Sequence, residues 1–432
     1  MKRKPGTEKK WIVLRDSRKP MKTRIISIAL FLVSGLTSPL ASGEDQPQPY
    51  DPPETTVGYS RQTIAVAGHE FEVQVPETFQ LELLNPNLES PRMIHFHGDR
   101  MFIGSRAGNI YWMDPPYRKT HTLAKMGWYP HSIIIRDQTI LVARTHGIYQ
   151  ASYTMDTNWI SEGSFGLLVA LPGGRGHNSR TLKLGPDGNL YVSLGIRGNC
   201  SDEYLDASYE FDSRRGGIHV IDESGPVATL VPFASGLRNP VGFDWHPESK
   251  TMYASNNGPD HLGFDQPPEY FSEIKRGSFH GMPWFQFDGE KLRRDPCAQS
   301  VPPRPVSEVS IPVATFDPRN APMDLAFVPS HGKATEFAGD AIVALRGSWG
   351  TAPDGSGTGD PATRRHPKLV LVEFENGQAT SNVLDLTLGF QSASGERWIR
   401  PVGVVVGPDG EIYFTSDSGI QGLYRLKKTE PE

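Results

Sequence analysis

GPDGNLYVSLG, residues 185–195, places a Pro-Asp-Gly turn directly before a segment in which apolar side chains alternate with other side chains. The same arrangement returns near the C-terminus as GPDGEIYFTSDSG, residues 407–419. Alternation with a period of two, bounded by a tight polar turn, is typical of a half-buried β-hairpin. The two stretches therefore predict one kind of structural unit that occurs at least twice.

Four more segments follow the same pattern of turn, alternating strand, Gly-containing bend and second strand. Their turns are HGDR, IRDQ, HPES and FAGD, which begin at residues 97, 135, 246 and 337. The mature chain has no convincing segment with the 3.6-residue period of a helix. Six such units predict a radial repeat, and hence an all-β fold, a six-bladed β-propeller of four-stranded antiparallel blades.

The intervals between the units are uneven, which predicts insertions in particular loops. The longest is expected between the fourth and fifth units, from about Gly258 to Glu336, and is rich in Pro, aromatic and acidic residues. In repeat folds, insertions gather on one face, often the binding face. Near the N-terminus, the alternating stretch from Ile64 to Pro76 is a candidate outer strand that closes the ring with the C-terminal blade.

Composition excludes some classes of partner. The chain has 44 Lys and Arg against 49 Asp and Glu, so no broad basic surface for nucleic acid is expected. Residues 1–43 read as an upstream extension followed by a signal peptide, with Lys22 and Arg24 before an apolar run and small residues after it. We therefore expect a single propeller domain at residues 44–432, periplasmic or secreted, with no stable membrane insertion after signal cleavage.

The two cysteines, Cys200 and Cys297, both lie in loop-like sequence. An oxidising compartment permits a disulfide between them, and the sequence is equally compatible with two unpaired thiols. Neither lies near a histidine at the spacing of a zinc site. The chain also lacks a P-loop, a strand-linked dinucleotide fingerprint and a serine-hydrolase elbow.

His177 ends the glycine-rich loop GGRGH, residues 173–177. Glycines allow backbone conformations and close ligand approaches that a Cβ would block, so a titratable side chain displayed there is a candidate for chemistry. The alternative is a histidine that only hydrogen-bonds its own loop.

Further candidates lie at the entrances of later strands. Arg238 and Asn239 precede Pro240, and a permanently charged guanidinium there can stabilise an oxyanion or a quinone oxygen. The stretch from Asn256 to Ile274 offers hard oxygen ligands, which suit Ca²⁺ although their spacing is not that of an EF-hand, and a solvated acidic loop is the alternative. Its acidic residues are Asp260, Asp265, Glu269 and Glu273.

The segments GHNSRTLKLGPDGNLYVSLG, GLRNPVGFDWHP, NNGPDHLGFDQPPE, FAGDAIVALRGSW and RPVGVVVGPDGEIYFTSDSG resemble successive landmarks of the glucose/sorbosone dehydrogenase family. The resemblance runs from about Met93 to Leu426. It implies a secreted six-bladed propeller that uses pyrroloquinoline quinone (PQQ) and Ca²⁺ to oxidise an aldose sugar, with an external electron acceptor.

The resemblance also implies roles for individual residues. His177 matches the catalytic base, and Arg238 with Asn239 matches the pair beside the quinone. Gly258 and Pro259 match the turn whose carbonyls hold the cofactor calcium. Arg346 falls where many relatives have a lysine or a histidine, and Arg400 falls where an arginine meets a cofactor carboxylate, so both are expected to bind the cofactor. Asp260, Asp265 and Glu269 remain candidate metal ligands because of their oxygen chemistry.

This chain departs from the family pattern at some positions. Gly176 stands where some relatives have an acid, and His261, Phe264 and Tyr270 stand where acids are usual in the calcium loop. These departures put a second, structural calcium in doubt. Two other classes of function stay open: a calcium-dependent propeller hydrolase such as a lactonase, and a propeller that only binds glycans or proteins.

Overall fold

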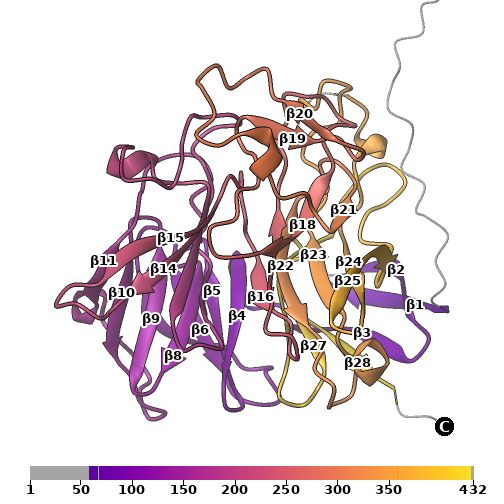
Figure 1. The fold of residues 1–432 in the computed structure, drawn as a ribbon. Helices are drawn as coiled ribbons and strands as arrows, with labels where there is room; N and C mark the ends of the chain where they lie inside the picture. Colours follow the sequence, from indigo (N-terminus) through magenta and orange to yellow (C-terminus); the bar gives the residue numbers. More distant parts are fainter. Residues whose placement is uncertain (1–57, 67, 358, 430–432) are drawn as a thin grey trace, which may run out of the picture. The chain divides into compact units, whose positions relative to one another are not determined.

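A computed structural model describes residues 58–66, 68–357 and 359–429, and they form almost only strands (Figure 1). The predicted upstream extension and signal peptide lie outside these residues. In the described ranges, no helix has the length and apolar character needed to cross a membrane.

Six four-stranded antiparallel sheets form the blades of a propeller, as the repeated turns predict. The first blade has β4 (Pro91–His97), β5 (Arg100–Ser105), β6 (Asn109–Met113) and β7 (His121–Lys125). The second has β8 (Ser132–Arg136), β9 (Thr139–Arg144), β10 (Gly147–Ser152) and β11 (Gly166–Ala170). The third has β12 (Leu182–Leu184), β13 (Leu190–Leu194), β14 (Gly217–Asp222) and β15 (Thr229–Ser235).

The remaining blades follow in chain order, and the last one is completed by a strand from the N-terminal part. The fourth has β16 (Phe243–Trp245), β17 (Met252–Asn256), β18 (Glu269–Ile274) and β21 (Ala314–Phe316). The fifth has β22 (Pro322–Phe327), β23 (Ala341–Leu345), β24 (Lys368–Glu375) and β25 (Gln378–Asp385). The sixth has β26 (Ile399–Val406), β27 (Ile412–Gly419), β28 (Gly422–Lys428) and β3 (Phe79–Asn85).

Two hairpins and five short 3₁₀ turns lie outside the blades. The hairpins are β1 (Tyr59–Val66) with β2 (His69–Pro76), and β19 (Phe285–Phe287) with β20 (Leu292–Arg294). The 3₁₀ turns are η1 (Glu162–Ser164), η2 (Phe211–Ser213), η3 (Val306–Glu308), η4 (Thr335–Phe337) and η5 (Pro361–Thr363).

Each of the six turns found in the sequence joins the first strand of a blade to its second strand. First strands of neighbouring blades contact one another, as β4 does with β8 and with β26, so these strands surround the centre of the ring. The core lies between blades: Leu141 of the second blade and Val192 of the third are fully buried in one hydrophobic cluster. Such alternating strands bury one face against each adjacent sheet.

Two details of the predicted organisation were wrong. The stretch from Ile64 to Pro76 does not close the ring, because β1 and β2 pair with each other, and β3 pairs with β28 instead. The segment from Gly258 to Glu336 is not one insertion, because it contains β18, β21 and β22. β21 has only three residues, and neither β18 nor β21 follows one of the six repeated turns.

Candidate functional site

The predicted site residues lie in or beside loops that emerge at one end of the propeller. In an antiparallel blade, the loop from the second to the third strand and the loop from the fourth strand to the next blade leave the same end. His177 lies between β11 and β12, Arg238 and Asn239 lie between β15 and β16, and Arg346 follows β23. Arg400 is at the start of β26. The topology therefore brings together residues that are far apart in sequence.

The ring of His177 is held in one orientation. Its Nδ1 lies 2.6 Å from the carbonyl oxygen of Ile196 and donates to it, because a carbonyl only accepts. The carbonyl of His177 itself accepts from Arg180 at 2.9 Å and from Arg215 at 2.7 Å. With Nδ1 protonated in the neutral ring, Nε2 carries the free lone pair.

Burial, followed by the positive charge of Arg238, lowers the pKa of His177 to about 3. The imidazole is therefore neutral near pH 7 and can accept a proton at Nε2. An anion bound beside Arg238 would offset that positive charge and raise the pKa of His177 again.

Two glycines, Gly176 and Gly195, allow the loop of His177 to lie close to the β13–β14 loop and to Asn239. A Cβ on Gly195 would lie 2.4 Å from Oδ1 of Asn239 and 2.6 Å from the Cβ of His177, so these two side chains flank the same bare backbone. Gly176 has φ +91°, and a Cβ there would lie 1.8 Å from the carbonyl oxygen of Arg197. The backbone thus leaves no room at residue 176 for the acid that some relatives carry.

Arg238 is buried and fixed by Asn199, a residue of the β13–β14 loop. Its Nη2 donates to Oδ1 of Asn199 at 2.6 Å, and its Nε donates to the Asn199 carbonyl at 3.1 Å. Asp260 is a looser partner, with 3.8 Å between its Oδ2 and Nη2. The backbone carbonyl of Arg238 also accepts from the N–H of Ile196 at 2.8 Å. The segment from Ile196 to Asn199 therefore positions both Arg238 and His177.

Arg346 and Arg400 form a second cluster at the fifth and sixth blades. Asp417 accepts from two arginines: its Oδ1 from Arg346 Nε at 2.9 Å, and its Oδ2 from Arg92 Nη1 at 2.6 Å. Arg400 donates to the carbonyls of Arg346 and Gly347 at 2.9 and 3.0 Å. Within the described residues, no hydrogen bond or ion pair joins Arg346 or Arg400 directly to His177.

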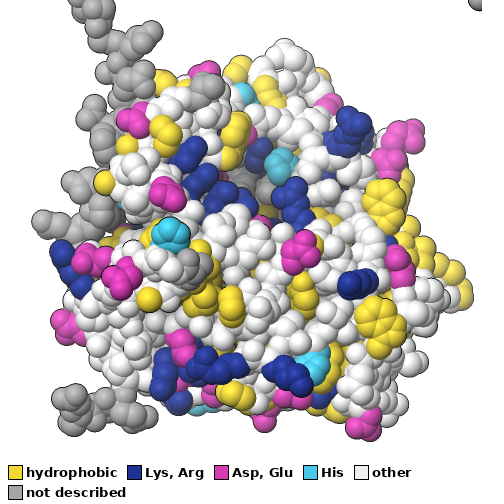
Figure 2. All heavy atoms as spheres, turned by 180° about the vertical axis from the view of Figure 1, so that it is seen from behind, with side chains coloured by type: hydrophobic (Ala, Val, Ile, Leu, Met, Phe, Trp, Pro, Cys, Tyr) yellow, Lys and Arg dark blue, Asp and Glu magenta, His cyan; other side chains and the backbone are white. Residues whose placement is uncertain are grey.

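This second cluster has more positive than negative charge. Burial, then Arg346 and Arg397, lower the pKa of Arg400 to about 8, while Asp417 is the neighbouring acid. Figure 2, which keeps the top of Figure 1 at the top, shows Lys and Arg side chains gathered around a hollow in the upper half of that face. Half-buried guanidinium groups in excess of acids fit a ligand with several carboxylates, because bidentate pairing would compensate their charge.

The predicted calcium ligands do not form a cation cage. Asp265 is an exposed residue whose carboxylate pairs with Arg365 at 2.8 Å. Glu269 is buried and accepts the N–H of Gly258, and burial raises its pKa to about 7. The carbonyl of Pro259 and a carboxylate oxygen of Asp260 accept from Arg319. These oxygens fit a guanidinium better than Ca²⁺.

A disulfide joins Cys200 to Cys297 across 97 residues, so of the two possibilities that the sequence left open the structure has the bonded one. His261 lies beside it, with 2.8 Å between its Nε2 and Oδ1 of Asp295 and 3.9 Å between its Nδ1 and Sγ of Cys297. The fold therefore brings a histidine to a cysteine that sequence spacing kept apart. The bond ties the loop of Asn199 to the segment that carries β19 and β20, which lies at the top of Figure 1.

Sequence reasoning missed Asn199, Arg319, Arg215 and Asp417. Arg215 is fully buried and donates to the carbonyls of Gly173, Arg175, His177 and Gly195, so it shapes the histidine loop from beneath. No local sequence pattern marks such a residue. Asp417 could have been predicted, because it is the acidic residue of the TSDSG segment in the sixth repeat.

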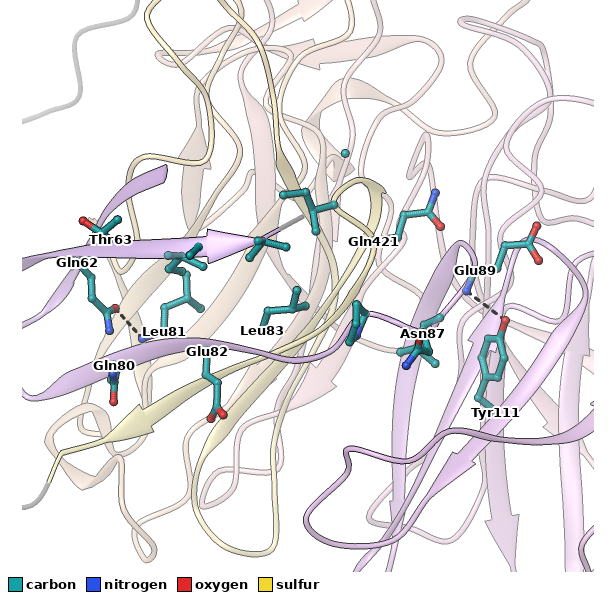
Figure 3. Close-up of a pocket in the computed structure, with 17 residues that line it drawn as sticks. Gln62, Thr63, Gln80, Leu81, Glu82, Leu83, Asn87, Glu89, Tyr111 and Gln421 are labelled. Atoms are coloured by element: carbon teal, nitrogen blue, oxygen red, sulfur yellow. Dashed lines mark hydrogen bonds between the residues drawn. The ribbon is translucent and has the colours of Figure 1, made fainter. Parts of the chain in front are cut away.

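A large pocket lies elsewhere, between the β1–β2 hairpin and the sixth blade (Figure 3). Its volume is about 1060 Å³, and Gln62 and Leu81, whose side chain and backbone hydrogen-bond at 2.9 Å, belong to its lining. None of the predicted site residues lines it. Its size alone does not make it the site of chemistry.

Comparison with known proteins agrees with the fold and with the family that the sequence resembles. The family model described as "Glucose / Sorbosone dehydrogenase" matches residues 166–425. An uncharacterized protein of Borreliella burgdorferi is 26% identical over 389 residues, covering 84% of this chain and 93% of that protein.

Two solved structures share the fold at low identity. The holo form of the pyranose dehydrogenase PQQ domain from Coprinopsis cinerea has a TM-score of 0.64 and 18% identity, covering 83% of this chain and 97% of that one. A calcium structure of the Trichoderma reesei carbohydrate-active enzyme of family AA12 has a TM-score of 0.67 and 18% identity, covering 87% and 98%. Since the family model spans more than half of the residues, this chain belongs to the glucose/sorbosone dehydrogenase family.

Proposed function

We propose that the protein is a PQQ-dependent oxidoreductase that oxidises an aldose sugar or a related alcohol or aldehyde, with His177 as the general base. The observation that carries the proposal is the fixed tautomer of His177, whose Nδ1–H donates to Ile196 and leaves Nε2 free beside the buried Arg238. Family membership and the PQQ domain among the similar folds support the cofactor.

The role of His177 follows from this geometry. A sugar hydroxyl placed against Nε2 would give up its proton to the neutral imidazole. The Ile196 carbonyl and Arg215 would keep the ring and its loop in place during that transfer, so that the base does not have to reorganise. The chemistry that a bound quinone supplies is acceptance of a hydride from the carbon that bears this hydroxyl.

The arginines would hold and polarise the cofactor. Arg238 is fixed by Asn199 and lies close enough to affect the charge state of His177, which suits a cation that stabilises negative charge on a quinone oxygen. Arg346 and Arg400 supply guanidinium groups for its carboxylates, and Asn239 supplies an amide beside Gly195. No step is assigned to calcium, because the oxygens expected to bind it already accept from Arg319.

The proposal includes an external electron acceptor and a periplasmic or secreted location. The apolar N-terminal run supports that location, although it lies outside the described residues. A reduced quinone must be reoxidised after each turnover, so an acceptor that can reach the loop end of the propeller is part of the reaction.

Turnover of the purified mature protein with PQQ, a panel of aldoses and a dye acceptor tests this function. His177→Ala should lower kcat by a factor of about 100 or more while quinone binding persists, since general-base catalysis contributes about 10²–10⁴-fold. His97→Ala, at the turn between β4 and β5, is the matched control and should keep full activity. Full activity of His177→Ala would refute the mechanism.

A further inference from the structure

Arg319 occupies the place where a calcium ion is expected in this family. It lies between β21 and β22, and its side chain is 2% exposed. Its guanidinium contacts the loop that begins with Gly258 and Pro259 and ends at Asp265. We call residues 258–265 the carbonyl loop.

The guanidinium is bound by several oxygens of the carbonyl loop at once. Nη1 donates to the carbonyl of Pro259 and, at 2.6 Å, to Oδ1 of Asp260. Nη2 donates to the carbonyls of Asp260 and Gly263. Carbonyl and carboxylate oxygens are also the ligands that Ca²⁺ prefers. The donor set of a calcium loop is thus present, but a side chain of this protein already satisfies it.

The surrounding charges disfavour a divalent cation in addition. Nη2 of Arg238 lies 3.8 Å from Oδ2 of Asp260, so two buried guanidinium groups share this carboxylate. Glu269, a buried acid next to the loop, accepts the backbone N–H of Gly258, and Asp265 pairs with Arg365. A calcium ion would have to sit within a few ångströms of two permanent positive charges, where repulsion at low dielectric is strong.

The segment of Pro353 and Gly355 packs closely against Arg319 and the carbonyl loop. Arg319 has φ +70°, a left-handed backbone that side chains other than glycine adopt at a cost. Gly355 packs over the guanidinium so closely that a Cβ there would lie 2.8 Å from Nη2 and 2.9 Å from the Asp260 carbonyl. Phe264 N–H donates to the carbonyl of Pro353 at 2.8 Å, which fastens the same segment to the carbonyl loop. The space next to these oxygens is therefore filled.

We propose that Arg319 is the resident cation of the carbonyl loop and that this loop needs no calcium to keep its structure. The inference rests on the proposed function only for the expectation that a relative binds calcium here. The positive charge that an ion would supply at this end of the propeller comes instead from a covalently fixed guanidinium.

Thermal unfolding and calcium titration of the mature protein, without quinone or sugar, test the proposal. Wild type should have the same Tm in EGTA and in millimolar Ca²⁺, and calorimetric titration should detect no calcium bound at this loop. Arg319→Ala should lower the Tm in EGTA by about 5 °C or more, because it leaves the loop carbonyls without their donor and Asp260 with only the looser partner Arg238. Added Ca²⁺ should then bind saturably and restore part of that Tm.

Three variants make the result specific. Arg365→Ala removes a guanidinium that pairs with Asp265 of the same loop, but Asp265 is exposed, so the variant should lose less Tm than Arg319→Ala and should show no response to calcium. Arg319→Lys keeps the charge and should also show no response, which retains a readout if Arg319→Ala does not fold. Calcium binding by wild type that Asp260→Asn abolishes would overturn the proposal. Because no turnover is measured, this outcome is distinct from failure of the dehydrogenase function.

Discussion

At the scale of the residue, the surroundings of His177 decide what it can do. Burial and the charge of Arg238 keep its imidazole neutral, and the Ile196 carbonyl fixes which nitrogen carries the proton. The sequence indicated His177, Arg238 and Asn239 as a group, and the structure brings them around Gly195 and Ile196. It could not indicate Arg319, whose partner Asp260 is 59 residues away and belongs to another blade connection.

Removing the charge of Arg238 should raise the pKa of His177. In Arg238→Met, the repulsion that disfavours imidazolium is lost, so the pKa should move up from about 3 toward the ordinary value of about 6.5. Titration of the His177 ring protons by NMR measures this shift. Arg238→Lys keeps a positive charge and should leave the pKa low. The same low pKa in Arg238→Met would show that Arg238 does not act on the histidine.

At the scale of the element, the blades were easier to predict than their connections. Alternation and Pro-Asp-Gly turns are local signals, so all six hairpins between first and second strands were found. The sequence did not identify β3 as the strand that closes the ring. Only its pairing with β28, near the C-terminus, distinguishes β3 from the equally alternating β2. Asp265, a predicted calcium ligand, pairs with Arg365, a contact that the sequence could not indicate because the two residues are 100 positions apart.

The Cys200–Cys297 disulfide should stabilise the loop end of the propeller. It connects the β13–β14 loop to the segment of β19 and β20, and a cross-link over 97 residues removes many conformations of the unfolded chain. Cys297→Ser should lower the free energy of unfolding by about 2–4 kcal/mol. Denaturant unfolding with and without dithiothreitol measures this loss.

The matched control for the disulfide is the reduced wild type, which should resemble Cys297→Ser, whereas the variant itself should not respond to dithiothreitol. Because Asn199 is next to Cys200 and holds Arg238, quinone affinity should weaken together with stability. Equal stability of the oxidised and reduced wild type would contradict this role.

At the scale of the whole molecule, one end of the ring combines a neutral base with an excess of buried arginines. The propeller positions these groups because loops from several blades converge there, while the six repeated turns lie between first and second strands. Composition alone gave no sign of this cluster, because the net charge of the chain is only -5. The distribution of charge, and not its sum, prepares the site for an anion.

Stability should fall when the pH drops below about 6.5. Burial lowers the pKa of seven histidines in the folded protein, five of them strongly, so the unfolded chain binds more protons. Each of the five costs about 1.4 kcal/mol per pH unit until its folded pKa is reached. Four acids act in the opposite direction but are fewer: Glu269 and Asp340, with pKa values raised to about 7 and 6, and Asp324 and Asp385, whose pKa values burial also raises. The five histidines are His95, His131, His177, His219 and His280.

Denaturant unfolding between pH 8 and pH 4.5 measures this dependence. The loss should begin near pH 6.5, before carboxylates of ordinary pKa are protonated. His219→Gln removes one buried histidine on β14 and should flatten the slope, whereas His69→Gln, at an exposed position, should not. A stability that stays constant from pH 7 to pH 4.5 would be inconsistent with neutral buried histidines.

An absorbance titration of the mature protein with PQQ tests whether the arginine-rich loop end holds the quinone beside His177, as we propose. We expect saturable binding that Arg400→Met weakens by a factor of about 10 or more, and bleaching of the bound quinone when an aldose that is a substrate is added. Absence of saturable binding would rule out a PQQ-dependent dehydrogenase and would favour a hydrolase or a glycan-binding propeller.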